Sequence, residues 1–339
     1  MRHMVSPVRS LGFKGMLITS GLAPPSKPAA LDEGTRGDER HVVFYIHGGG
    51  YHIGHPLQQL FWLCSLRWRM WRRYRRCAAI FCLDYTLSDV GGYPLQISEA
   101  NAAYDWLSSS FEPRRILLMG DSAGGNAALA LCHSVMNRAR RYREGREGKG
   151  DLSPAIQDFF GTIPGEILPA GVITLSPWLD LRCESHAYER NRLRDWLDAG
   201  LLKYWAERYV GKNGSPHSGA VSPGLESPSK LGNLPLYVTG GGDELLADDF
   251  HSFGRRCREE RAAGCTILDV REHQVHDHSI MFHAMGLASA CDALDRLACV
   301  SSFMWDLNSS EKMAGNLLDI GHADLATVER VLTALRKHE

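Results

Sequence analysis

The chain has 339 residues, of which 44% are apolar, so one α/β domain with insertions can bury a large core. The formal net charge of −1 excludes a global electrostatic attraction to nucleic acid or anionic membranes, and we expect no nucleic-acid partner. The nine cysteines form no C-x-x-C pair, which argues against a zinc site or a disulfide framework, so we expect neither a metal nor a cofactor.

The sequence contains no apolar run long enough for a signal peptide or a membrane span. Because its cysteines are also scattered, we expect a cytoplasmic protein without an integral membrane anchor.

Short apolar runs alternate with helix-like segments along the chain. Runs that are apolar throughout are typical of strands buried on both faces, so the pattern predicts an α/β fold with a mostly parallel central sheet flanked by helices. The predicted strands are Val42–Ile46, Ala78–Leu83, Arg115–Met119, Val172–Leu175, Leu236–Thr239 and Cys265–Val270.

We predict three parts in the chain. Residues 1–40 form an amino-terminal segment and partial cap, residues 41–300 form the catalytic domain, and residues 301–339 form a helical tail. The proline-rich stretch at Pro24, Pro25 and Pro28 disfavours a long cap helix.

Six arginines between Arg67 and Arg76 are interleaved with Trp68, Trp71 and Tyr74. This pattern is compatible with a patch that binds nucleic acid or a membrane surface. We favour an outer helix whose aromatic rings pack on the sheet, because arginine side chains readily cover apolar surface.

The strongest local motif is Gly120-Asp121-Ser122-Ala123-Gly124, between a predicted strand and a helix-like run that starts at Asn126. G-x-S-x-G in that setting is typical of a nucleophile elbow, where small neighbours allow a strained turn that exposes the serine. The alternative is a strand–helix turn that merely requires glycine. We predict that Ser122 is a nucleophile.

A second glycine-rich loop, His47-Gly48-Gly49-Gly50, follows the strand Val42–Ile46. Acyl transfer passes through a tetrahedral oxyanion that needs preorganised amide donors, and a loop of three glycines can present them. The amide of Ala123 would add a donor from the elbow. We expect His47 to anchor the loop rather than to act in catalysis.

A serine hydroxyl needs a histidine base that is oriented by a carboxylate. In enzymes with this elbow the chain order is serine, acid, histidine. After the strand Leu236–Thr239 we choose Asp243 as the acid, with Glu244 as its immediate rival and Asp248 as a distant third. The alternative role for Asp243 is a helix N-cap.

Position alone leaves the base open among four histidines near the last predicted strand. His283 is the least favoured because it falls inside a helical run, and those without the catalytic role are expected at the surface. The four are His273, His276, His278 and His283.

Taken together, these motifs resemble the hormone-sensitive-lipase family of α/β-hydrolase esterases. The histidine motif is most similar to the fungal sterol-acetate and arylacetamide deacetylase-like branch. The likeness covers about residues 40 to 290. It rests on His47–Tyr51, Asp84–Leu87, Tyr93-Pro94, Gly120–Gly125, Ser176–Asp180, Asp243 with Leu245 and Asp248 (D-x-L-x-D with one extra residue), and Val275–Asp277.

The resemblance implies that His276 is the base, that the amides of Gly49, Gly50 and Ala123 form the oxyanion hole, and that Gly48 shapes the turn. It also implies a shortened cap, or a chain that begins late, because family members usually carry a longer amino-terminal region.

The expected function is hydrolysis of a small-molecule carboxylic ester, with a short acyl chain on a fairly apolar alcohol, through a Ser-Asp-His triad and an acyl-enzyme. One alternative is an N-acyl hydrolase such as an amidase or formamidase. Another is a non-catalytic, ligand-binding relative, which the complete triad disfavours.

Overall fold

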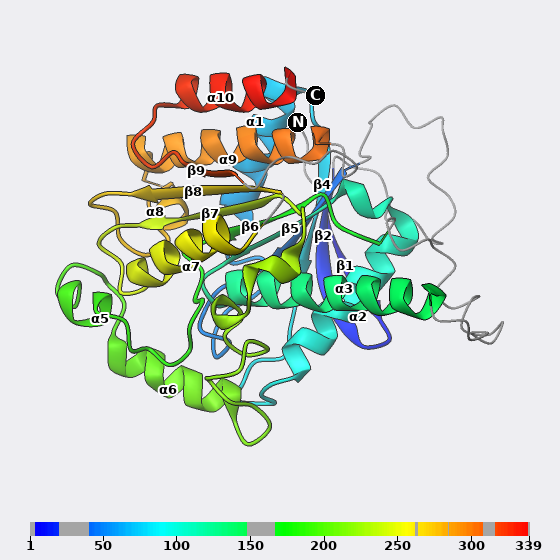
Figure 1. Ribbon diagram of the computed structural model, residues 1–339, viewed down its shortest axis with the longest axis vertical. Coiled ribbons are helices and arrows are strands. Elements are labelled where there is room, and N and C mark those ends of the chain that lie inside the picture. Colours follow the sequence, from blue (N-terminus) through cyan, green and yellow to red (C-terminus); the bar gives the residue numbers. More distant parts are fainter. Residues whose placement is uncertain are drawn as a thin grey trace.

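Nine strands in the described part of the chain form one sheet that helices cover on both faces in the computed structural model (Figure 1). The structure describes residues 4–19, 41–147, 167–261, 264–283, 285–307 and 316–337. The strand order is β1-β2-β4-β3-β5-β6-β7-β8-β9. Neighbours from β4 through β9 run parallel, whereas β1 pairs with β2, and β2 with β4, in antiparallel fashion. The predicted fold class is confirmed.

The central strands are buried because both faces of the sheet are covered. In β3, for example, Phe44 belongs to the core on one face and Tyr45 to the core on the other, as alternation along a strand requires. The strands are β1 Met4–Ser10, β2 Phe13–Thr19, β3 His41–Ile46, β4 Ala78–Leu83, β5 Ile116–Asp121, β6 Gly171–Leu175, β7 Leu236–Gly241, β8 Cys265–Arg271 and β9 Asn316–Asp319.

Two layers of helices enclose the sheet (Figure 1). One layer consists of α1 (Leu60–Tyr74), α9 (Ala288–Asp306) and α10 (Leu325–Lys337). The other consists of α2 (Leu95–Ser110), α3 (Ala123–Glu147) and α7 (Ala247–Glu260). The shorter elements are α5 (Ala187–Arg190), α6 (Ala199–Val210), α8 (His278–Met281), and the 3-10 turns η1 (Pro113–Arg115), η3 (Pro223–Leu225) and η4 (Pro228–Leu231).

Residues 4–19 of the amino-terminal segment form the β1–β2 hairpin, and Met16 pairs with Cys82 of β4, so the hairpin extends the sheet. The predicted cap residues Pro24, Pro25 and Pro28 lie outside the described residues.

The predicted boundary between the catalytic domain and the carboxyl-terminal tail does not coincide with the end of an element. The expected division at residue 300 falls inside α9, whose residues are largely buried on their sheet-facing side. The segment beyond it is not only helical, because β9 pairs in parallel with β8 before α10 begins.

The arginine-rich segment forms α1, as expected, but its rings do not all face the sheet. Trp62 is buried, whereas Trp68 and Trp71 lie on the outer surface of the helix. The prediction that these two indoles pack on the sheet is therefore wrong.

Among the described helices, none combines the length and the apolar character that crossing a bilayer requires. No cluster of histidine, cysteine and acidic side chains suited to a metal ion occurs in the described ranges.

Candidate active site

Ser122 lies at the turn between β5 and α3, with its backbone in the left-handed region at φ +52°. A Cβ on Gly120 would lie 2.2 Å from the Gly124 carbonyl oxygen, and one on Gly124 would lie 2.0 Å from the Ile46 carbonyl oxygen. Both positions therefore require glycine. The turn places Ser122 at the carboxyl edge of the parallel sheet, next to the first amides of α3.

The loop after β3 adopts the backbone shape that its glycines permit. Gly49 and Gly50 have φ angles of +112° and +60°. The Gly48 amide donates to the Asp121 carboxylate at 3.0 Å. Within the described ranges, by contrast, the amides of Gly49 and Gly50 donate to no protein group. Gly48 is thus committed to shaping the turn, and the next two amides are left for a ligand.

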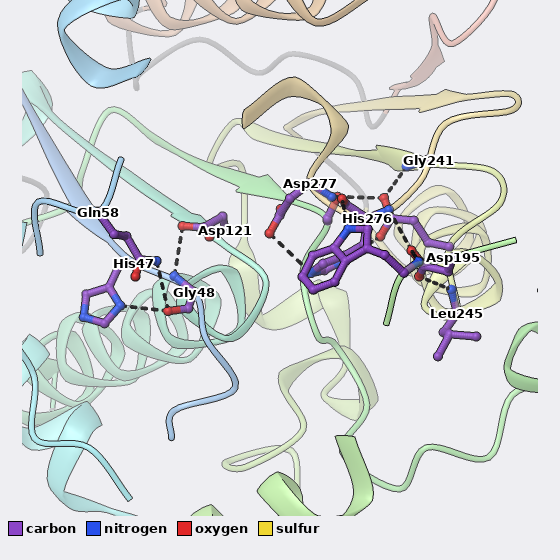
Figure 2. Close-up of polar contacts among 12 residues, drawn as sticks. His47, Gly48, Gln58, Asp121, Asp195, Gly241, Leu245, His276 and Asp277 are labelled. Atoms are coloured by element: carbon purple, nitrogen blue, oxygen red, sulfur yellow. Dashed lines mark hydrogen bonds and ion pairs between the residues drawn. The ribbon is translucent and has the colours of Figure 1, made fainter. Parts of the chain in front are cut away.

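Asp121 connects the elbow to this loop (Figure 2). Besides the Gly48 amide, its buried carboxylate accepts a hydrogen bond from the Tyr45 hydroxyl. Burial raises the pKa of Asp121 to about 6, against the opposing effect of these donors.

His47 has the surroundings of a structural residue. Its ring stacks on Tyr85 with centroids 4.2 Å apart, and Nδ1 lies 2.8 Å from the Gly48 carbonyl oxygen. Burial lowers the pKa of His47 to about 4, which keeps the imidazole neutral.

His276 is fully enclosed in the loop that follows β8, and its ring is held by a carboxylate. Nδ1 lies 2.9 Å from Glu244 Oε2, and both side chains are buried. The other oxygen of Glu244 accepts the Ser176 hydroxyl at 2.7 Å and also the Gly241 amide. Glu244 is thus fixed by three donors, and one of them is the imidazole.

The structure does not bring the predicted acid, Asp243, to His276. The Asp243 side chain is 21% exposed and pairs with Arg194 at 3.2 Å, while His273 Nδ1 is 3.8 Å away. The backbone explains the difference: the Asp243 amide donates to the Gln274 carbonyl, which turns its side chain outward and that of Glu244 inward.

The structure therefore brings Glu244, the stated rival, to His276 in place of Asp243. The residue spacing within this motif is the feature of the sequence that favours Glu244. Counted from Glu244, the sequence reads E-x-L-x-D with Leu246 and Asp248 and needs no extra residue. Asp248 itself pairs with Arg190 on the surface.

The other candidate histidines lie away from Glu244. His273 is exposed, as expected of a surface residue. The expectation fails for His278 and His283, which are buried. Burial lowers the pKa of both rings, to about 4 for His278.

Two positioning residues were not identified from the sequence. Asp195 accepts the amides of His276 at 3.1 Å and Leu245 at 2.9 Å, so it ties the base loop to the acid loop (Figure 2). Ser176 donates to Glu244 and accepts the Asp277 amide at 3.1 Å. Ser176 stood in a recognised motif, whereas Asp195 lies in a loop without one.

Carboxylates determine the electrostatics of the base. Burial alone would lower the pKa of His276, but Asp277 and Glu244 raise it to about 10. Asp277 Oδ2 lies 3.3 Å from the other ring nitrogen of His276, Nε2. Burial raises the pKa of Asp277 well above its usual range, although the adjacent imidazole opposes that shift.

Comparisons with known proteins find relatives that are named as hydrolases. A 28% identical acetyl-hydrolase from Streptomyces hygroscopicus aligns over 61% of this chain, and the chain spans only 58% of that relative. Steryl acetyl hydrolase 1 of Saccharomyces cerevisiae is 30% identical over 69% of this chain and 52% of its own length. Human arylacetamide deacetylase-like 2 is 31% identical over 65% of this chain and 63% of its own length.

Solved structures share the fold. An esterase from the bacterial hormone-sensitive lipase family superposes with a TM-score of 0.67 at 24% identity, covering 89% of this chain and 85% of its own. An esterase/lipase from an uncultured bacterium gives the same TM-score at 23% identity, with 90% and 86% covered. The resemblance drawn from the motifs is confirmed. The family described as alpha/beta hydrolase fold matches residues 43–280, and this chain belongs to it.

Proposed function

We propose that this protein is a carboxylic ester hydrolase with Ser122 as nucleophile, His276 as base and Glu244 as the acid of the triad. The observation that carries the proposal is the 2.9 Å contact between His276 Nδ1 and buried Glu244, at the sheet edge where the elbow presents Ser122. A carboxylate on Nδ1 fixes the tautomer whose Nε2 can accept a proton.

The chemistry follows from these positions. Ser122 Oγ attacks the ester carbonyl carbon while His276 Nε2 takes the hydroxyl proton. The amides of Gly49, Gly50 and Ala123 stabilise the oxyanion that forms. The intermediate then collapses, the alcohol leaves with the proton from His276, and an acyl-Ser122 ester remains. Water attacks that ester with His276 again as base, which releases the carboxylic acid and restores Ser122.

The names of two relatives, acetyl-hydrolase and steryl acetyl hydrolase, suit a short acyl group, and the second suits an ester of a fairly apolar alcohol. The name arylacetamide deacetylase-like refers to an amide instead. An N-acyl hydrolase would use the same groups, and rates on matched ester and anilide substrates separate the two activities.

Residues 187–210 supply a cap in this proposal. Trp205 of α6 packs against Gly50, because a Cβ there would lie 2.2 Å from its ring. On the other side, Trp196 donates from Nε1 to the His276 carbonyl at 2.8 Å. One indole thus lies against the oxyanion loop and the other against the backbone of His276, and in this proposal the two restrict the length of acyl chain that fits.

Glu244→Gln should lower kcat by about 10⁴ with the fold retained, because the amide favours the wrong imidazole tautomer. The matched control is Asp243→Asn, which breaks only a partly exposed ion pair and should change kcat less than about fivefold. Steady-state hydrolysis of p-nitrophenyl acetate by both variants provides the measurement. A crippled Asp243→Asn beside an active Glu244→Gln would return the acid role to Asp243.

The pH dependence of kcat/KM should change when the charge of Asp277 is removed. Protonated His276 cannot take the Ser122 proton, so kcat/KM rises as the pH passes upward through the raised pKa of the imidazole. Asp277→Asn removes a neighbouring negative charge and should move this acid limb about 1 unit or more toward lower pH. Asp243→Asn serves as the control and should leave the limb in place. An unmoved limb in Asp277→Asn would show that Asp277 does not tune the base.

Acetyl and butyryl esters should be hydrolysed faster than decanoyl or longer esters. Burial of each acyl methylene contributes about 0.8 kcal/mol to binding. In the proposed cap, the indoles of Trp196 and Trp205 limit how many methylenes of a long acyl chain can be buried. A panel of p-nitrophenyl esters of increasing acyl length measures kcat/KM directly. A profile that rises steadily through dodecanoyl esters would contradict the restricted site.

A further inference from the structure

The outer face of α1 carries a stripe of aromatic and basic side chains. Relative to Phe61, the residues Trp68, Arg72 and Arg75 follow at spacings of 7, 11 and 14, which place all four on one side of a helix. Phe61 is 66% exposed, and Trp68 and the adjacent Trp71 are 37% and 38% exposed. The opposite face of α1 is buried, so these aromatic rings are not needed for packing against the sheet.

Apart from buried Arg67, the arginines of this segment fall into two groups. Arg69 and Arg73 pair with Asp295 of α9, and Arg76 pairs with Asp306. Arg72 instead lies over the Trp68 ring at 4.9 Å, and Arg75 over the Trp71 ring at 5.4 Å.

Within the described ranges, no carboxylate pairs with Arg72 or Arg75. Their charges therefore remain available to an anionic partner, and each sits directly on an exposed indole.

The same face continues to the edge of the sheet where the active site lies. The Phe61 ring is 5.6 Å from the His283 ring, and Trp62 Nε1 donates to the Ser279 carbonyl of α8 at 2.9 Å. Three apolar side chains at and after the end of α8 are exposed, and Met285 is the most exposed of them at 70%. The three are Met281, Met285 and Leu287. In Figure 1, α1 lies beside α9 in the helical layer on this side of the sheet.

We propose that this face docks on an anionic lipid bilayer. We call it the α1 surface, and it comprises Phe61, Trp68, Trp71, Arg72, Arg75, Met281, Met285 and Leu287. Guanidinium groups bind headgroup phosphates in a bidentate manner, indoles settle at the headgroup level, and Phe, Met and Leu side chains enter the acyl region. Because the overall charge is only −1, the attraction is local to this surface.

The apolar residues distinguish a bilayer from a nucleic acid as the partner. A polyanion in water would use the arginines and stack on the indoles, but it offers nothing to exposed methionines and Leu287. A bilayer uses both groups, and it concentrates apolar esters beside the sheet edge that carries Ser122. Docking depends on the exposed rings and the charge of this surface, and it does not require Ser122 to be the nucleophile.

Sedimentation of the full chain with large unilamellar vesicles tests the proposal. Vesicles of phosphatidylcholine with 30% phosphatidylserine should bind the protein more tightly than phosphatidylcholine alone, and raised salt should weaken the binding. Arg72→Gln/Arg75→Gln should lower the partition coefficient about 25-fold, since each basic residue near an anionic surface contributes about fivefold. The matched control is Arg255→Gln/Arg258→Gln on α7, in the opposite helical layer, which should change it less than twofold.

Phe61→Ser/Met285→Ser should also weaken vesicle binding. All these variants should hydrolyse soluble p-nitrophenyl acetate like the wild type, and Ser122→Ala should still bind vesicles, so failure of docking and failure of the proposed function are distinguishable. Equal binding to neutral and anionic vesicles, or equal loss in the α1 and α7 variants, would overturn the proposal. Retention on duplex DNA that depends on Arg72 and Arg75 but not on Phe61 and Met285, without vesicle binding, would identify a nucleic-acid surface instead.

Discussion

The left-handed backbone at Ser122 is the constraint on which the rest of the site depends. A non-glycine residue at φ +52° costs about 1–3 kcal/mol and persists only where its surroundings hold it. Here the Ser122 amide donates to the Leu175 carbonyl at 2.8 Å, and the Ser122 carbonyl accepts the Trp178 amide at 3.0 Å. The end of β6 and the loop after it therefore hold the turn from both sides.

That same loop connects the elbow to the other members of the site. Ser176 lies between the two residues that hold Ser122, and its hydroxyl binds Glu244 while its oxygen accepts the Asp277 amide. The proposed nucleophile, the proposed acid and the loop of the proposed base thus all contact one short segment after β6. A change of backbone there would misplace all three, which gives the Ser-Pro-Trp motif a physical reason to stand beside the elbow.

Burial of several carboxylates around one imidazole sets the chemistry of the base. Glu244, Asp277 and Asp121 are all enclosed, and burial raises the pKa of each. A positive imidazolium relieves the repulsion among them, so the environment favours the charged form of His276. In the proposed mechanism, the same preference stabilises the imidazolium that forms during acyl transfer, and His276 is a neutral base only at higher pH.

The parts of the site that depend on local backbone geometry could be predicted from the sequence. Ser122 and the Gly48–Gly50 loop could be predicted because close backbone approach leaves glycine as the only choice around them. The sequence could not show which of the two adjacent carboxylates, Asp243 or Glu244, turns inward. The hydrogen bond from the Asp243 amide to the Gln274 carbonyl decides this, and Gln274 lies in a distant segment of the chain. The outward position of Trp68 was missed for a similar reason: buried Trp62, Leu66 and Met70 already fill the sheet-facing side of α1.

Stoichiometric labelling with a fluorophosphonate, read by intact mass and peptide mapping, tests most directly whether Ser122 is the nucleophile. We expect one phosphonyl group per chain, located on the peptide that contains Ser122. Esterase activity should be lost in parallel, and Ser122→Ala should not be labelled. A label on another serine, or full activity in protein that carries the label on Ser122, would contradict this assignment.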